Sequence, residues 1–223
     1  MTELRVEAAM PAIDFYRACR YAPRPAARLR PDPRTGLDSL SMSRAFPRRH
    51  TRFSAQVCKL LKDCEIPADY GRVHRLRLQP ECRELATIGT DIHGREQMLS
   101  PRAARAWYAM RNAAQDEGVE LAVASAFRSV DYQASIIQRK RQAGQAMEDI
   151  LRVSAAPGYS EHHSGRALDI ATPDSRPLET EFEMTAAFDW LTDSAGDFGF
   201  SLSYPRNNRH GIAYEPWHWA WQG

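Results

Sequence analysis

Two short stretches near the C-terminus carry residues whose types and spacing could bind a metal ion. Their sequences are SEHHSGRALD at residues 160–169 and EPWH at residues 215–218. His162, Asp169 and His218 offer two imidazoles and a carboxylate, a ligand set that Zn²⁺ accepts, and three protein ligands leave the fourth tetrahedral position for water. Glu215, three residues before His218, is the natural proton acceptor for that water. The pattern therefore predicts a catalytic site with one zinc ion per chain.

The two stretches also match a pair of family motifs. The first matches Ser-x-His-x-x-Gly-x-Ala-x-Asp at every fixed position, and the second matches Glu-Pro-Trp-His. In these motifs, and over about residues 55–221, the sequence resembles the zinc D-alanyl-D-alanine carboxypeptidases of the vancomycin-resistance type. Their relatives include D-Ala-D-Ala dipeptidases and, in the metal core, lysostaphin-type endopeptidases and hedgehog domains. The resemblance implies that three residues bind the zinc ion: His162, Asp169 and His218. It also implies that Glu215 is the general base and acid.

His163 falls on a variable position of the first motif, so we expect it to be a polar group outside the metal ligands. Gly165 and Ala167 are small residues between two expected ligands, where the chain must turn and pass close to the metal.

A third stretch, SAFRSVDYQ at residues 125–133, follows an apolar run and precedes a helical pattern. It resembles the Ser-x-Tyr-Arg-Ser element of the same family, with Phe127 in place of the tyrosine. By that resemblance Arg128 donates to the scissile carbonyl and stabilises the oxyanion, while Gln133 and Ser160 bind the terminal residue of the substrate. A guanidinium suits this role because it stays charged and presents a planar fork of donors.

The family resemblance implies an enzyme that hydrolyses the C-terminal D-alanine of peptidoglycan stem peptides, with stem peptides or muropeptides as its partners. Two reactions stay open, D,D cleavage of a pentapeptide and L,D cleavage of a tetrapeptide. A non-catalytic zinc-bearing peptidoglycan-binding module is an alternative, although such a module has no need of a base such as Glu215. A peptidoglycan endopeptidase is a further alternative.

The N-terminal part of the chain differs from the rest in composition. Residues 1–53 hold eleven arginines, no lysine and five acids, and six of the fourteen prolines. Such a segment is typical of poor order, so we expect an arginine- and proline-rich arm over residues 1–52 and a zinc carboxypeptidase domain over residues 53–223. Basic charge attracts phosphate, but the arm lacks the interleaved aromatic residues of a nucleic-acid binder, and we expect no nucleic-acid partner.

The sequence shows no secretory signal and no run of about 18 apolar residues, so a membrane span is not expected. The four cysteines form no CxxC pair, and we expect free thiols, which fits a reducing compartment. These features favour the cytoplasm, with the periplasm as the alternative if the true start differs. A cytoplasmic location would favour L,D work on recycled muropeptides, because trimming precursor pentapeptides there would deprive cross-linking of substrate.

Apolar spacing and turn residues predict the elements that position these groups. Helices are expected over residues 53–64, 101–117, 130–143 and 182–195. A hairpin is expected over residues 85–99, and strands are expected before residue 124, through Asp169 and His218, and around Phe200 and Ile212. The alternation of Trp217, Trp219 and Trp221 with His218 should direct the histidine to the metal and the indoles into the core. The predicted fold is one α+β domain, a small, mostly antiparallel sheet with flanking helices and the zinc site in a cleft on the sheet.

Overall fold

A computed structural model of the chain describes residues 48–223, the side chains of residues 48–51 excepted. The expected arm therefore lies almost wholly outside the described residues. The first described element, helix α2 (Arg48–Asp63), begins within the last residues of that arm.

Two antiparallel sheets form the β part of the fold. The larger has the strand order β3-β4-β6-β5, with bounds β3 (Ala122–Ser125), β4 (Ala167–Ala171), β5 (Phe200–Leu202) and β6 (His218–Trp221). The smaller is the expected hairpin, β1 (Ala86–Thr90) and β2 (Glu96–Leu99). Together with the helices, these sheets confirm the predicted α+β class.

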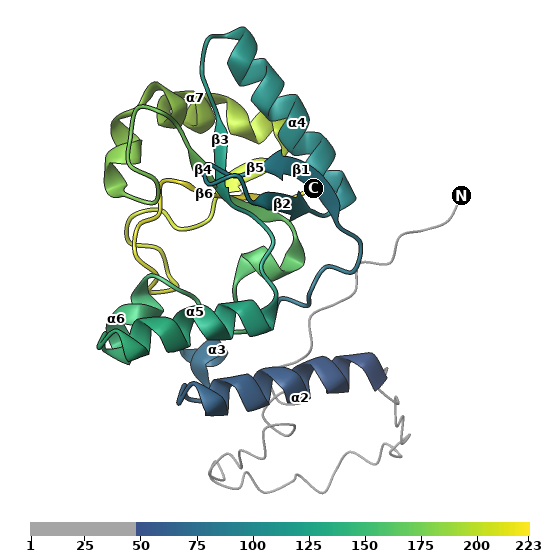
Figure 1. Cartoon of the computed structure of the whole chain (residues 1–223), viewed down its shortest axis with the longest axis vertical. Coiled ribbons are helices and arrows are strands. Elements are labelled where there is room, and N and C mark those ends of the chain that lie inside the picture. The colour runs from purple at the N-terminus through teal and green to yellow at the C-terminus, as the bar shows by residue number, and fades with distance from the viewer. Residues whose placement is uncertain (1–47) are drawn as a thin grey trace, which may run out of the picture.

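The helices lie in two groups on either side of the strands (Figure 1). One group contains α4 (Pro101–Asp116) and α7 (Ala186–Ser194). The other contains α2, α3 (Tyr70–Val73), α5 (Val130–Gln142) and α6 (Met147–Arg152). Three short 3₁₀ turns complete the described elements, η1 (Glu161–Ser164), η2 (Thr180–Met184) and η3 (Ala195–Phe198).

The larger hydrophobic core joins α4 and α7 to the four-stranded sheet. Trp107 and Met110 on the predicted inner face of α4 are fully buried, and they share this core with Leu168 of β4 and Trp219 of β6. The indole of Trp219 donates to the carbonyl of Pro216 at 3.0 Å. The expectation that this tryptophan belongs to the core is confirmed.

A second core joins α2, α5 and α6. Val57 and Leu61 of α2 meet Ile137 of α5 and Ile150 of α6 there. Gly158, at the start of the segment that leads to the metal motif, has φ +87°, and a Cβ on it would lie 2.5 Å from Cγ2 of Val57. Because only glycine allows this approach, α2 fixes where that segment begins.

The predicted helix over residues 182–195 is wrong in its first part. Thr185 is extended (φ −103°, ψ 152°), and its hydroxyl accepts from the amide of Phe188 as the N-cap of α7. The chain before it is the turn η2, and Met184, expected to face inward, is 83% exposed. The strand expected around Ile212 is also absent from the described residues, although Ile212 is buried.

The cysteines differ from expectation at one position. Cys64 and Cys82 are free, whereas Cys58 is disulfide-bonded, which corrects the expectation of free thiols for Cys58. Cys19 lies outside the described residues. Between residues 48 and 223 no helix combines the length and apolarity needed to cross a bilayer.

Candidate metal centre

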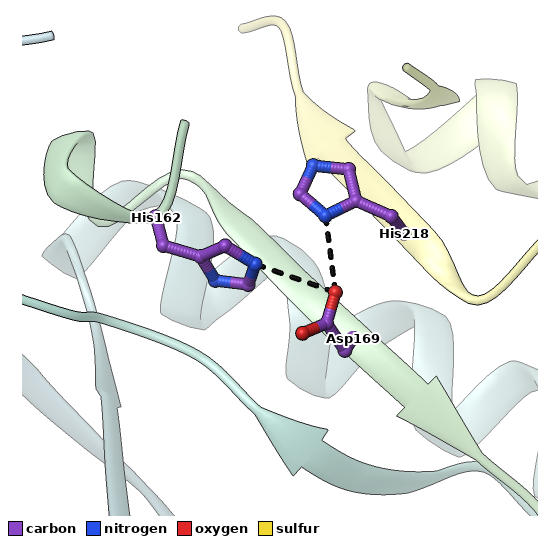
Figure 2. Close-up of side chains that lie close together, drawn as sticks. All are labelled: His162, Asp169 and His218. Carbon is purple, nitrogen blue, oxygen red and sulfur yellow. Dashed lines mark hydrogen bonds and ion pairs between the residues drawn. The ribbon is translucent and has the colours of Figure 1, made fainter. Parts of the chain in front are cut away.

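The sheet register brings two of the expected ligands face to face. In the antiparallel pair of β4 and β6, Asp169 lies directly opposite His218. The third, His162, stands on η1, which ends at Gly165 in the left-handed conformation (φ 64°) and so turns the chain into β4. Figure 2 shows the three side chains pointing toward one another from these separate elements.

His162, Asp169 and His218 are all buried, and one ligand atom from each lies within 4.8 Å of the others. Oδ1 of Asp169 is 3.3 Å from Nε2 of His162 and 3.0 Å from Nδ1 of His218. Burial alone would raise the pKa of Asp169, but His162, His218 and Arg128 hold that pKa well below its usual range. The carboxylate is therefore ionised, as a metal ligand must be.

The tautomer of His162 suits a metal ion. Its Nδ1 lies 2.6 Å from the carbonyl oxygen of Ala126, so Nδ1–H donates there and Nε2 carries a lone pair. Burial lowers the pKa of His162 to about 4, which keeps the ring neutral. Within the described part of the chain, Nε2 is buried without a hydrogen-bond partner. This lone pair faces the oxygen of Asp169, and two acceptors so placed repel unless a cation lies between them.

His218 is held from its far side by Glu161, which we did not predict as a site residue. Nε2 of His218 lies 3.0 Å from Oε2 of Glu161. Although burial opposes it, the hydrogen bonds that His218 donates to Asp169 and Glu161 raise the pKa of His218 to about 10. With Nε2–H donating to Glu161, Nδ1 is the nitrogen that can lose its proton to solvent and then bind a metal ion through its lone pair. A carboxylate behind a histidine in this way orients metal ligands in proteins.

Glu215 lies beside the cluster, with Oε2 3.8 Å from Nδ1 of His218. Burial raises the pKa of Glu215 to about 7. A carboxyl group with a pKa near neutrality can both accept a proton and return it, as a general base and acid must.

Arg128 reaches the cluster from the segment before α5. Its Nη2 is 3.4 Å from Oδ2 of Asp169, and its Nη1 donates to Oε1 of Gln133 at 3.2 Å. Gln133 is 1% exposed, and its amide nitrogen donates to the carbonyl of Ala155 at 2.8 Å. The structure thus places Gln133 where it supports Arg128. Ser160 is also buried and lines the cavity at the metal cluster.

His163 joins the metal motif to the segment that carries Arg128. Its Nδ1 donates to the carbonyl of Arg128 at 2.7 Å, and its Nε2 accepts from the amide of Gly158 at 3.1 Å. Burial lowers the pKa of His163 to about 3, so the ring is neutral and makes both bonds. It is a polar group outside the ligand cluster, and it fixes Arg128 relative to His162.

Two neighbouring spaces at this cluster share part of their lining. A cavity of about 30 Å³ is lined by His162, His218, Arg128, Ser160 and Glu215, among others, and has room for a group the size of a water molecule. A groove of about 500 Å³ begins at Asp169 and Glu215 and extends past the hairpin turn and α5. Arg128, Ser154 and Glu215 line both spaces. A small group at the metal cluster and a longer chain in the groove could thus be bound together.

Comparison with known proteins gives concordant matches. The chain is 36% identical over 134 residues to a Bacillus subtilis protein named "Putative carboxypeptidase YodJ", and 31% identical over 187 residues to a D-alanyl-D-alanine carboxypeptidase of Enterococcus faecium. These matches cover 56% and 82% of this chain, and 46% and 50% of the relatives. The chain thus spans about half the length of the curated relatives it matches.

Solved structures give the same family. The LD-carboxypeptidase LdcB matches with a TM-score of 0.58 and 32% identity, over 64% of this chain and 70% of that one. The D,D-pentapeptidase VanY from a VanB-type resistance cassette, in complex with Zn(II), matches with a TM-score of 0.52 and 26% identity. This match covers 66% of our chain and 83% of the VanY chain. The family described as VanY, D-alanyl-D-alanine carboxypeptidase, matches residues 96–223. The chain belongs to this D-alanyl-D-alanine carboxypeptidase family.

Proposed function

We propose that this protein is a zinc-dependent carboxypeptidase that releases the C-terminal D-alanine from peptidoglycan stem peptides. The observation that carries the proposal is the convergence of three buried metal-ligating groups, His162, Asp169 and His218, beside Glu215. Among the similar structures, one VanY protein is a complex with Zn(II) and another is a complex with D-alanine-D-alanine.

The ligand set fits zinc, because two imidazoles and one carboxylate leave a tetrahedral position open once His218 has lost its Nδ1 proton. His162 would bind through Nε2, whose lone pair has no hydrogen-bond partner in residues 48–223, and His218 through Nδ1. When bound, zinc supplies a Lewis acid that polarises a water molecule and the peptide carbonyl.

Glu215 moves the proton in this proposal. Its carboxylate accepts a proton from the attacking water and then delivers it to the nitrogen of the departing D-alanine. Its burial and its raised pKa suit both steps near neutral pH. One carboxyl group therefore serves the attack and the departure.

Arg128 stabilises the negative charge that develops on the carbonyl oxygen. The contacts with Gln133 and Asp169 hold its guanidinium at the cavity before substrate arrives. Charged donors that need not reorganise during reaction give strong stabilisation in a site that excludes water. Ser160, on the wall of the same cavity, contributes to binding of the terminal D-alanine.

We propose L,D cleavage of tetrapeptides as the main reaction. The likeness to LdcB, an LD-carboxypeptidase, has higher sequence identity (32%) than the likeness to the D,D-pentapeptidase VanY (26%). The two reactions use the same catalytic groups and differ in the residue before the scissile bond.

Zinc-loaded protein incubated with a tetrapeptide and with a pentapeptide, with products identified by mass, tests the proposal. We expect tripeptide and free D-alanine from the tetrapeptide. Glu215→Gln should keep its zinc and slow this release by about 10²-fold or more, whereas Glu148→Gln, an exposed acid on α6, should not change the rate. Wild-type protein that leaves both peptides intact would refute the function, and wild-type rates for Glu215→Gln would refute the role of Glu215.

A further inference from the structure

The groove of about 500 Å³ offers more space than a terminal alanine needs. At one end it reaches two groups of the proposed catalytic apparatus, Asp169 and Glu215. One wall is formed by three side chains that project from α5 at helical spacing, Tyr132, Ile136 and Lys140. A groove that starts at the metal cluster and has a polar and apolar lining suits the peptide on the N-terminal side of the scissile bond.

Lys140 is the unusual residue of this wall. Its side chain is partly buried, and its ammonium donates to the hydroxyl of Ser154 at 2.9 Å. None of the ion pairs between described residues includes Lys140. Burial, followed by the charge of Arg128, lowers the pKa of Lys140. A partly buried ammonium without a carboxylate partner carries a desolvation cost that an anionic ligand would offset.

Of the arginines and lysine that line the groove, Arg95 and Arg128 form ion pairs with acids of the protein, whereas Lys140 forms none among the described residues. Arg95, which also lines the groove, is already neutralised by Asp91, with Nε 2.7 Å from Oδ2. The acids that line the groove, Asp169 and Glu215, face the metal cluster and belong to the proposed mechanism. The charge of Glu215 opposes the lowering of the pKa of Lys140, but among the described residues no lining acid forms an ion pair with Lys140.

Lys140 is also close to the reacting end of the groove. Its partner Ser154 lines both the groove and the small cavity, while Lys140 lines only the groove. In the proposed function, the departing D-alanine lies on the side of the metal cluster that carries Arg128 and Ser160. Because Lys140 lines the groove and not the cavity, a carboxylate bound by it fits the peptide segment just before the scissile bond.

We propose that Lys140 binds a side-chain carboxylate on the third residue of the stem peptide, and that the protein thereby prefers diaminopimelate to lysine at this position. Diaminopimelate ends in a carboxylate as well as an amine, whereas lysine ends in an amine alone. In a tetrapeptide this residue directly precedes the scissile bond. The inference rests on the proposed function, since it assigns the groove to a stem peptide.

The test is a comparison of binding affinities in zinc-loaded Glu215→Gln protein, which should bind substrate and turn it over slowly. The probes are three tetrapeptides that differ only at the third residue: diaminopimelate, diaminopimelate amidated on its side-chain carboxylate, and lysine. We expect the diaminopimelate peptide to bind most tightly. Adding Lys140→Met should lower the affinity for the diaminopimelate peptide by about tenfold or more, because a charged hydrogen bond is lost. The affinities for the other two peptides should change little.

Two further variants separate charge from structure. Lys62→Met removes an exposed lysine of α2 and should change none of the three affinities. Ser154→Ala removes the hydrogen bond but keeps the ammonium, so the preference for the free carboxylate should persist. Equal losses for all three peptides in Lys140→Met, or no loss, would overturn the inference while leaving the proposed function intact. If zinc-loaded Glu215→Gln protein binds none of the three peptides and wild-type protein releases no D-alanine, both this inference and the proposed function are refuted.

Discussion

Glu161 shows how a residue outside the three ligands can set the properties of the metal centre. It accepts from Nε2 of His218 at 3.0 Å; burial alone would raise the pKa of Glu161, but this hydrogen bond and the charge of His218 lower it. The bond fixes the ring of His218 and leaves Nδ1 for the metal. We therefore assign Glu161 a positioning role.

Replacing Glu161 with Gln tests that role. The amide oxygen can still accept from His218, but its charge is lost, so zinc affinity should fall by about 10- to 100-fold without loss of the fold. Competition with a chromophoric chelator measures the affinity, and circular dichroism checks the fold. Glu148→Gln, at an exposed position, is the control. Unchanged zinc affinity in Glu161→Gln would show that His218 is oriented without it.

The sequence alone predicts the residues of the cluster whose types are unusual together, His162, Asp169 and His218, and the structure brings them within reach of one another. The sequence does not predict the residues that support these ligands. Glu161 occupies a variable position of the motif, and an acid beside a histidine is ordinarily a solvated neighbour. The substrate contact expected of Gln133 stays a prediction, and the sequence does not show that its amide also bonds to Ala155, because a contact between segments this far apart leaves no local pattern.

At the scale of elements, the turn from η1 into β4 determines whether His162 and Asp169 can meet. Gly165 makes this turn with φ 64°, and a Cβ there would lie 2.9 Å from the backbone nitrogen of Ser100. The amide of Ser100 donates to the carbonyl of Gly165 at 2.8 Å. The turn is thus confined both by its own dihedral angle and by the segment before α4.

Gly165→Ala should therefore destabilise the protein by about 1–3 kcal/mol and weaken zinc binding, because the left-handed conformation and the close contact both oppose a side chain. Denaturant titration of the zinc-free protein measures the stability. Gly94→Ala is a matched control: Gly94 has φ +76° but no atom within 4 Å of the added Cβ, so only the dihedral cost of about 1 kcal/mol should appear. Equal effects at the two positions would mean that the contact with Ser100 is unimportant.

The elements themselves were largely predictable where periodicity and stop signals agree. The helices α2, α4 and α5 and the hairpin β1–β2 lie close to their expected positions. The helix expected from residue 182 failed because Thr185 makes a cap through its hydroxyl, a local bond that competes with helix continuation and leaves apolar spacing unchanged. The burial of Ile212 comes from Tyr204 and Ala155 and needs no strand.

At the scale of the whole molecule, the site lies where two cores meet. The sheet of the larger core supplies Asp169 and His218, while the helices of the second core support the segment around residues 153–160 and the wall that carries Lys140. Helix α2 is part of this second core, through Val57 and Leu61.

Two N-terminal deletions should therefore differ sharply in the stability of the folded protein. A protein that starts at residue 48 keeps α2 and every proposed site residue, and it should fold, bind zinc and turn over as the full chain does. A protein that starts at residue 66 loses the α2 side of the second core and should be unstable, because several buried apolar side chains each contribute about 2–5 kcal/mol. Thermal unfolding and zinc content compare the two. Loss of activity in the longer protein would show that residues 1–47 contribute to the site.

The most direct test of the account is the zinc dependence of D-alanine release from the tetrapeptide. Protein stripped of metal should release none, and activity should rise in proportion to added zinc and level off at one ion per chain. His218→Ala, stripped and reloaded in parallel, should neither retain the ion on dialysis nor regain activity, since one of three ligands is missing. Full release of D-alanine by the metal-free protein, or full recovery of the His218→Ala variant, would contradict the account.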